Sequence, residues 1–411
     1  MDIEILNQER LAYWCGRLDF PSAAVDELAQ VARAVCEDET LLALFSAFHE
    51  KTALRGEWHK DWAPLPFDPQ VQAALGQRTA LFYLLAYLAA LPYAEKEYRR
   101  RGIPTKIFDD TMSDIRRYLL VVYDLEGRWG FREFMWIWLH LSCELFRLGR
   151  LQFRLGEFEG KVTAFRNNDS QRYLLLADPN MKLRPDGYAL GAGRIKGDAQ
   201  STWVGQAADL PADSGEWLPT FEESAAGWRG HPVSPYGNVL KEATFLPRQD
   251  WECVLKHEDT VLDLHIPPDE AFTVETCQAA LRQAFDFFAQ QSPEKTIRAG
   301  FCHTWFFTHP LQEFLPPESH IIQFQREFYL YPHPGGPGFL WAYTFGEKYR
   351  DLATAPRDTR LRRAMLDWLG QGKELFDLPG VFFHGPEEWG SQPYMREWDA
   401  GVVSSQSSVV S

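Results

Sequence analysis

Two histidines at the ends of strand-like segments are the residues best suited to catalysis. His265 lies in the alternating stretch Val261–Ile266, and His303 lies in the apolar stretch Thr296–Trp305. An unperturbed imidazole, with a pKa of about 6.5, accepts a proton at neutral pH. Because alternate residues of a strand share a face, Asp263 lies on the side of His265. We predict His303 as a base or substrate-orienting group, with His265 second and Asp263 its orienting partner; two interior, hydrogen-bonded histidines are the alternative.

Cys302 suggests a different chemistry, a covalent acyl-enzyme formed by a thiolate paired with a histidine. Its neighbour His303 projects to the opposite face of a strand, which leaves His309, His320 or His265 as partner. We favour a buried structural thiol. The histidines show no H-x-x-x-H or H-E-x-x-H spacing, so we predict no metal site. The sequence also has no G-x-S-x-G string, phosphate-binding P-loop or dinucleotide fingerprint.

The elements that position these histidines lie between Leu255 and Gly346. Alternation predicts the first strand, and apolar residues at helical spacing predict the helix after it. The predicted order is strand, helix, strand, short helix, strand, strand, at Val261–Ile266, Thr273–Gln291, Thr296–Trp305, Pro310–Leu315, Ile321–Tyr331 and Phe339–Phe345. Gly335–Gly338 would join the last two strands as a hairpin.

The flanking regions differ in pattern. Residues 22 to about 152 show helical periodicity nearly throughout, with helices predicted from Ser22 and Pro104 and over Thr40–His49, Val71–Arg101 and Phe131–Leu148. We interpret the aromatic residues and His140 there as core. Short strands follow at Phe158–Asn167, Arg172–Asp178 and Ala243–Leu246, around a long 197–238 loop that could act as a lid. A helix is predicted over Arg360–Phe376, with arginines near its start.

Composition limits the classes of function. The 411 residues are enough for two domains. With 42 basic against 57 acidic side chains and a net charge of −15, the chain is not expected to bind nucleic acid or an anionic membrane. The six cysteines are scattered as reduced thiols would be, and no secretory signal is apparent, which predicts a cytoplasmic protein.

Several short strings carry a family resemblance. The strings lie at Gly102–Pro104, Asp110–Ile115, Leu145–Phe153, His265–Pro267, Cys302–Trp305, Leu315–Pro317 and Phe324–Gln325. In the same order, they resemble the motifs GIP, DT.SDI, LFRLGRLQF, HIP, CHSW, LLP and FQ of one protein family. In this respect the chain is similar to bacterial acyltransferase-domain proteins with a helical N-terminal domain and a GNAT-like C-terminal domain. The resemblance spans roughly residues 102 to 331.

This resemblance implies an α+β protein with a helical bundle over residues 1–150, a GNAT-like mixed-sheet α/β domain over 151–400 and a disordered tail over 401–411. It implies transfer of an acyl group from acyl-CoA, or from a pantetheine-bearing acyl carrier protein, to a small-molecule or peptide amine. The cofactor cleft would lie between the two strands that carry His265 and His303, where such strands splay apart. A GNAT-like module that binds a metabolite or protein without catalysis is the alternative.

The candidate cradle for the coenzyme is the loop from Pro267 to Thr273, which leaves a strand and enters a helix whose N-terminal N–H groups could hold an anion. The predicted cofactor-binding residues are Pro267, Ala271, Phe272, Thr273, Val274, Cys302 and Thr304. Asp269 and Glu270 stand where the family leads us to expect glycine, and they would repel a pyrophosphate, so an acidic solvent-exposed turn is the alternative. Arg194–Ala199 fits the R-x-x-G-x-A form of ordinary GNAT enzymes but is not followed by a predicted helix.

Overall fold

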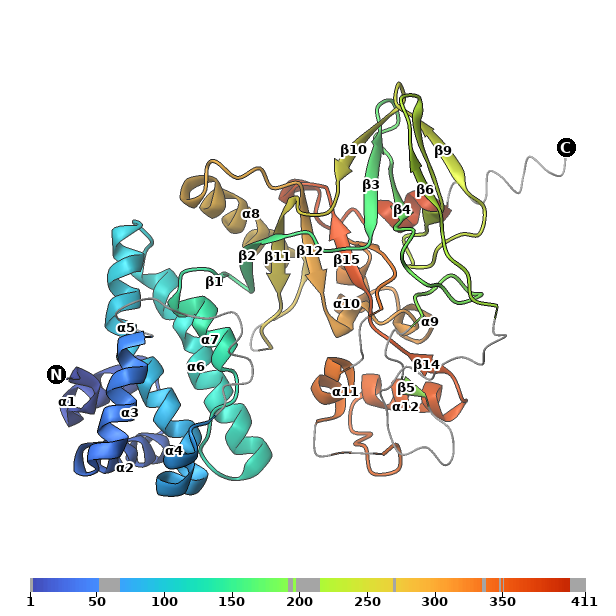
Figure 1. Cartoon of the computed structure of the whole chain (residues 1–411). Coiled ribbons are helices and arrows are strands. Elements are labelled where there is room, and N and C mark those ends of the chain that lie inside the picture. Colours follow the sequence, from blue (N-terminus) through green and yellow to red (C-terminus); the bar gives the residue numbers. More distant parts are fainter. Residues whose placement is uncertain are drawn as a thin grey trace, which may run out of the picture. The chain divides into compact units, whose positions relative to one another are not determined.

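The computed structural model describes residues 3–51, 67–190, 195–196, 215–268, 271–334, 338–346, 349 and 351–399. The chain divides into two compact units, Met1–Leu148 and Gly149–Ser411. The first is built from helices and the second mainly from strands with helices around them (Figure 1). This arrangement confirms the predicted α+β class.

The helical unit is organised around one apolar helix, α5. Its helices are α1 (Gln8–Arg17), α2 (Ser22–Glu37), α3 (Glu39–His49), α4 (Pro69–Leu75), α5 (Thr79–Arg100), α6 (Thr105–Glu126) and α7 (Phe134–Leu141). Helices α2, α3, α6 and α7 all contact α5. Every residue of α5 from Leu81 to Leu91 is buried, because a helix that is apolar on all sides must be covered on all sides.

Two predicted helices are shorter in the structure than in the sequence-based prediction. The predicted helix Val71–Arg101 is interrupted after α4, where Gly76 adopts a φ of 52° that favours glycine. The predicted helix Phe131–Leu148 ends at Leu141, and the chain continues into strand β1 (Phe146–Leu148). Cys143, with a φ of 58°, turns the backbone between α7 and β1.

A polar network lies in the interior of the helical unit. His140 and Asp114 are both 0% exposed, and His140 Nε2 lies 2.9 Å from Asp114 Oδ2. The other ring nitrogen, Nδ1, lies 3.1 Å from the carbonyl oxygen of Leu145. Trp136 donates its Nε1–H to Asp114, and the Arg117 guanidinium pairs with the same carboxylate. The interpretation of His140 as an interior, hydrogen-bonded histidine is confirmed.

The central sheet of the second unit carries the predicted site. Within this unit its strands follow the order β2 (Leu151–Glu157), β11 (Thr260–His265), β12 (Ala299–His303), β15 (Pro379–Phe382) and β13 (Tyr329–Leu330). Strands β11 and β12 run parallel and are joined through α8 (Val274–Gln291), while the other neighbours are antiparallel. The predicted strand–helix–strand core is therefore confirmed.

The residues between β2 and β11 in the sequence form smaller sheets. One has the order β10 (Trp251–Leu255), β3 (Val162–Asn167), β4 (Tyr173–Ala177), β8 (Pro232–Val233), and another has the order β6 (Phe221–Glu223), β7 (Gly227–Gly230), β9 (Thr244–Pro247). They stand beside the central sheet in Figure 1. The prediction of an unstructured loop over 197–238 is wrong for its second half, which supplies β6, β7 and β8; most of its first half lies outside the described residues.

The last part of the predicted strand order is also wrong. Residues 321–331 form helix α10 (His320–Gln325) and the short strand β13, and residues 339–345 belong to helix α11 (Gly338–Phe345). The partner of β13 is β15, so the two runs do not form a hairpin. A short buried apolar run fits a strand and a buried helix equally well by periodicity.

The C-terminal helix is shorter than predicted. Helix α12 (Arg360–Gly370) ends before β14 (Glu374–Leu375), whereas the sequence predicted helix to Phe376. The apolar residues of α11 and α12 share a core cluster that includes Leu340, Trp341 and Met365. The tail 401–411, predicted to be disordered, lies outside the described residues.

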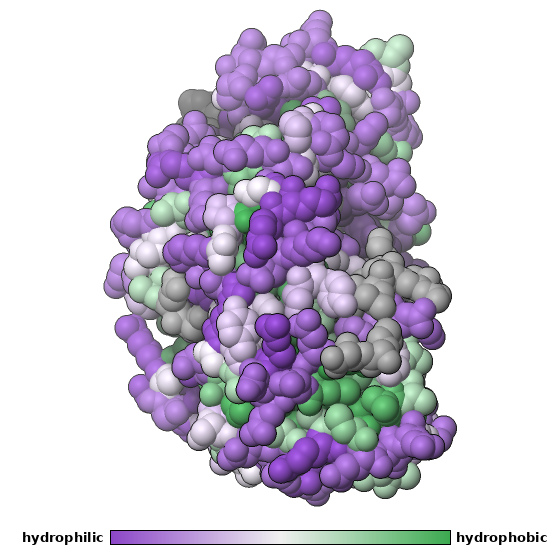
Figure 2. All heavy atoms as spheres, turned by 90° about the vertical axis from the view of Figure 1, so that its left-hand side faces the viewer, coloured by the Kyte–Doolittle hydropathy of each residue, from purple (hydrophilic) through white to green (hydrophobic). Residues whose placement is uncertain are grey.

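The surface agrees with the acidic, polar composition. The face shown in Figure 2 is mostly hydrophilic, with one apolar area towards its lower edge. Among the described residues, only the stretch Pro69–Arg100 is long and apolar enough to cross a membrane by length and composition, and 67% of its apolar window is buried inside the protein. That burial is what the core helix α5 requires.

Candidate active site

The two central strands separate at the end that carries the histidines. The parallel pairing of β11 with β12 runs from Val261↔Ala299 to Asp263↔Phe301 and stops there. Each strand continues for two more residues, to His265 and to His303. A pair of parallel strands that loses its hydrogen bonds at one end leaves backbone groups available to a ligand. The structure thus provides the separated strand ends that the resemblance implies, with one histidine at the end of each.

The first histidine forms a charged group with the strand on its other side. His265 Nε2 lies 3.3 Å from Asp263 Oδ2, as expected for two residues on one face of β11. Arg154 of β2 donates its Nε–H to the same carboxylate oxygen at 2.7 Å. Burial acts to raise the pKa of Asp263, but His265 and then Arg154 outweigh it and hold that pKa below its usual value. Asp263 is therefore an ionised, buried partner for the His265 ring.

The second histidine has a carboxylate partner that the sequence did not reveal. His303 Nε2 lies 3.5 Å from Oδ2 of Asp377, the residue two positions before β15. The His303 side chain is 34% exposed and that of Asp377 only 6%. The ring of His333 lies beside that of His303, with their centroids 5.2 Å apart in an edge-to-face arrangement. Burial, and then the neighbouring His303, lower the pKa of His333, which favours the neutral form of its ring.

One sequence signal could have located Asp377. It stands alone between apolar residues in Leu375-Phe376-Asp377-Leu378. Carboxylates are almost never fully buried unless they are paired, so a single acid in an apolar run indicates a partner. His333 follows the apolar end of β13 and carries no comparable signal.

Cys302 lies in the core. Its side chain is 1% exposed, and burial, with the charge of Asp263 second, raises the pKa of its thiol well above the usual value. A thiolate is disfavoured there, and a ligand does not reach the sulfur. The structure therefore favours the structural thiol over an acyl-enzyme, and it places Cys302 away from any cofactor surface.

The predicted cofactor loop enters its helix as expected. Thr273 is the N-cap of α8 and forms a capping box with Thr276, in which each side chain accepts from the other's backbone N–H at 3.3 and 3.0 Å. Hydrogen bonds from the Thr273 hydroxyl and from its own backbone N–H lower the pKa of Glu275. A carboxylate of the chain already uses this helix N-terminus, so a pyrophosphate would have to compete with it.

The remaining predicted contact residues differ in how accessible they are. Pro267 is buried, and Phe272 packs its ring against Phe306 and Phe324 at centroid distances of 5.2 and 5.0 Å. Ala271 is exposed, while Val274 and Thr304 are half-buried. Thr304 accepts from the Phe306 N–H at 3.4 Å. Pro267 is therefore an anchor of the loop and not a contact surface, and Asp269 and Glu270 lie outside the described residues.

Two basic segments elsewhere in the chain, Arg194–Ala199 and the arginines near α12, receive little support as phosphate sites. In the Arg194–Ala199 string, Ile195–Lys196 forms strand β5, paired with β14, and the other residues lie outside the described part of the chain. A phosphate-binding loop of this type leads into a helix. Arg357 and Arg362 near α12 pair with Asp367 and Asp358, as on a solvated charged face.

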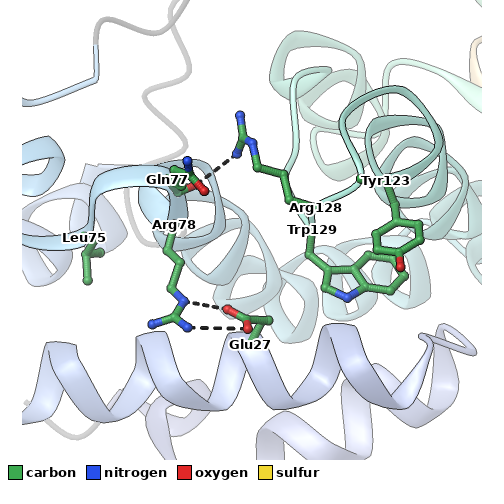
Figure 3. Close-up of a pocket in the computed structure, with 8 residues that line it drawn as sticks. Glu27, Leu75, Gln77, Arg78, Tyr123, Arg128 and Trp129 are labelled. Atoms are coloured by element: carbon green, nitrogen blue, oxygen red, sulfur yellow. Dashed lines mark hydrogen bonds and ion pairs between the residues drawn. The ribbon is translucent and has the colours of Figure 1, made fainter.

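The helical unit has a hollow of its own, shown in Figure 3. A cavity of about 460 Å³ is lined by Glu27, Leu75, Gln77, Arg78, Tyr123, Gly127, Arg128 and Trp129. Arg78 pairs with Glu27 at 2.5 Å, and Arg128 donates to the Gln77 carbonyl oxygen at 3.0 Å. Tyr123 and Trp129 stack at 4.1 Å. No histidine or cysteine lines this cavity, and its charged groups already have partners, since Arg128 also pairs with Glu126.

The comparisons with known proteins agree with this fold. Residues 145–382 match the family described as GNAT-like C-terminal domain, and residues 9–143 match the N-acyltransferase N-terminal domain. Solved structures of acyltransferases also resemble the chain, among them a mutant in complex with octanoyl-CoA and an enzyme in complex with decanoyl-CoA and teicoplanin. Both have a TM-score of 0.58 and 18% sequence identity to this chain. Each alignment covers 90% of this chain, and it covers 86% of the octanoyl-CoA structure and 85% of the teicoplanin structure. No curated protein matches the chain.

The fold and site thus define a protein of the acyltransferase class, in which two central parallel strands separate at their carboxyl ends. More specifically, the chain belongs to the family of N-acyltransferases that combine a helical N-terminal domain with a GNAT-like C-terminal domain. The family expected from the sequence motifs is confirmed.

Proposed function

We propose that this protein transfers an acyl group from acyl-CoA to an amine by direct attack at the separated ends of β11 and β12. The observation that carries the proposal is the end of strand pairing at Asp263↔Phe301, with a histidine–carboxylate pair on each side. Membership of the N-acyltransferase family supports it. So do the crystallised relatives of the same fold, which hold octanoyl-CoA, decanoyl-CoA or CoA.

The reaction forms a C–N bond and breaks the C–S bond of the thioester. The attacking amine loses a proton, and the departing sulfur gains one to leave as the thiol, so atoms and charge balance. His303 is one-third exposed and is the base that takes the amine proton. His265, held by Asp263, is the second titratable group at the opening and can orient the acceptor. Strand N–H groups no longer used in pairing are the donors available to the thioester oxygen.

The acceptor is proposed to be a small-molecule or peptide-like amine. A crystallised relative was solved with decanoyl-CoA and teicoplanin together, which supports an acceptor of that general kind. A pantetheine-bearing carrier protein is the alternative donor, since it presents the same thioester arm. A cytoplasmic location and a bacterial origin stay predictions from the sequence.

A non-catalytic binding module is the second candidate, and one observation favours it. Glu275 occupies the N-terminus of α8, where a phosphate of the coenzyme would be expected to bind. A binding module of this kind would hold a ligand at the separated ends of β11 and β12 without catalysing a reaction.

Two measurements test the proposal. The first is thermal unfolding with CoA and with octanoyl-CoA; a ligand at about 100 times its Kd stabilises the folded state by about 2.7 kcal/mol. The second is thiol release from octanoyl-CoA with a panel containing an amino acid, an amino sugar and a short peptide. Amine-dependent thiol release and an amide product by mass spectrometry are expected. Stabilisation without turnover, or no stabilisation by either compound, would contradict the proposed acyl transfer from acyl-CoA and favour the binding module.

A further inference from the structure

The cluster around His303 contains two groups, Asp377 and His333, that the function proposed above does not use. His303 ends β12, Asp377 lies just before β15, and His333 follows β13. Strand β15 lies between β12 and β13 in the sheet, and its residue Pro379 pairs with His303. The three side chains therefore meet at one edge of three adjacent strands, although they are far apart in sequence.

We propose that Asp377 is a positioning residue, which holds the His303 ring through Nε2 so that Nδ1 faces the acceptor amine, and which shares its single negative charge between His303 and His333. The proposal rests on the proposed acyl transfer for its catalytic meaning. The tautomer of His303 and the shared charge of Asp377 can be measured whether or not the protein turns over a substrate.

The tautomer follows from the geometry. An ionised carboxylate only accepts hydrogen bonds, so an imidazole nitrogen that faces it carries the proton. The facing atom is His303 Nε2, 3.5 Å from Asp377 Oδ2. This distance is long for a hydrogen bond, as is common in sites without substrate, and contacts of this kind tighten in the complex. Nδ1 is then the nitrogen with the lone pair, and the exposed third of the side chain makes the ring accessible to substrate.

The shared charge follows from which groups surround His333. Its titration is affected by burial and by three neighbours: His303 and Lys161, which lower its pKa, and Asp377, which raises it. The His303 and His333 rings lie 5.2 Å apart and Asp377 lies against His303, so the one carboxylate balances one positive charge and a second proton would meet the repulsion of the first. The cluster therefore accepts the one proton that the amine gives up and has one to return to the departing sulfur.

The test uses the full chain with ¹⁵N-labelled histidine rings, with the His303 and His333 signals assigned by His303→Gln and His333→Gln. In the wild type His303 is expected to show the Nε2–H tautomer. In Asp377→Asn the titration of His333 is expected to move down by on the order of 0.5–1 pH unit. Asp367→Asn, an exposed aspartate on α12 that pairs with Arg357, is the matched control and should change neither signal.

Two outcomes would overturn the proposal: an Nδ1–H tautomer of His303 in the wild type, or a His333 titration that is the same in Asp377→Asn and in the control. If Asp377→Asn does not fold, Asp377→Glu is the second variant. It keeps the negative charge, so His333 should titrate in it as in the wild type. A different titration of His333 in that variant would count against the shared charge. With an active acceptor, Asp377→Asn should lower kcat at least tenfold and leave KM within twofold. A wild type without acyl transfer would remove the proposed function, while the tautomer and the titration would still decide the role of Asp377.

Discussion

His265 lies opposite Gln152 of β2 although its own strand has already lost its pairing with β12 at Asp263. Strand β11 therefore stays hydrogen-bonded on one side over its full length. Strand β12 is held in the same way on its other side, where His303 lies opposite Pro379 of β15, so each histidine is carried by a hydrogen-bonded strand. The opening between them is thus built into the sheet and does not require a flexible loop to form.

We expect His303→Gln to lower kcat/KM for amine acylation by about 10²–10⁴-fold, the usual contribution of a general base. Because the side chain is one-third exposed, thermal stability should change little. His257→Gln is the control, since His257 is a mainly exposed histidine between β10 and β11. An equal loss of folding and activity in His303→Gln would show that the residue is architectural.

The buried thiol gives a second prediction. Cys302→Ala should retain turnover within a few-fold and lose roughly 0.5–3 kcal/mol of unfolding free energy, the ordinary range for a point substitution. Its thiol is buried and its pKa is raised, so it should carry no acyl group. Mass spectrometry of enzyme quenched during turnover, with the exposed Cys36→Ala as control, checks this. A protein-bound acyl group that disappears in Cys302→Ala would establish the acyl-enzyme route.

Asp263→Asn should change how stability depends on pH. The folded-state pKa of Asp263 is depressed, so the stabilisation is fully present above the unfolded value of about 3.9 and is lost as the pH falls through the folded-state value. At pH 7 the variant should be less stable by about 1.5–3 kcal/mol, the range for a hydrogen bond to a charged group. The difference should begin to shrink below about pH 3.9 and disappear once the pH is below the depressed folded-state pKa. Urea unfolding at several pH values measures the difference, and a gap that is independent of pH would contradict the assignment.

The buried Asp114 network of the helical unit predicts a large loss of stability on substitution. Asp114→Asn leaves Arg117 and His140 with a neutral partner, and breaking a buried pair costs about 3–5 kcal/mol. Asp110→Asn, one turn earlier on α6, removes an exposed pair with Lys106 and should cost about 0–1 kcal/mol. Urea unfolding of the full chain, followed by tryptophan fluorescence, compares the two. Similar costs would show that the buried network contributes no more than a surface pair.

The sequence predicted those parts of the fold that have long periodic patterns. The stripe of α8, the alternation of β11 and the cap at Thr273 are local signals, and each is found where it was expected. The hairpin near Gly335 was wrong because a short buried apolar run fits a strand and a helix equally well. Strand β15 was missed for a related reason, since four buried residues have no alternation to detect.

The candidate site was predicted only in part, because one of its two histidine–carboxylate contacts is local in sequence and the other is not. His265 and Asp263 share one strand, so their contact follows from the period of two. The contact of His303 with Asp377 depends on which strand inserts beside β12, and that is a property of the whole sheet. No spacing rule connects residues 303 and 377 without the sheet order.

The position of β15 has a consequence for how the protein is made. Until the ribosome has released residues 379–382, β12 has no partner on its outer side and presents a bare strand edge that could pair with another chain. Asp377 reaches His303 only when that late segment inserts. A nascent or truncated chain would therefore hold β11 and α8 in place before His303 meets Asp377, and assembly of this pair would be among the last events of folding.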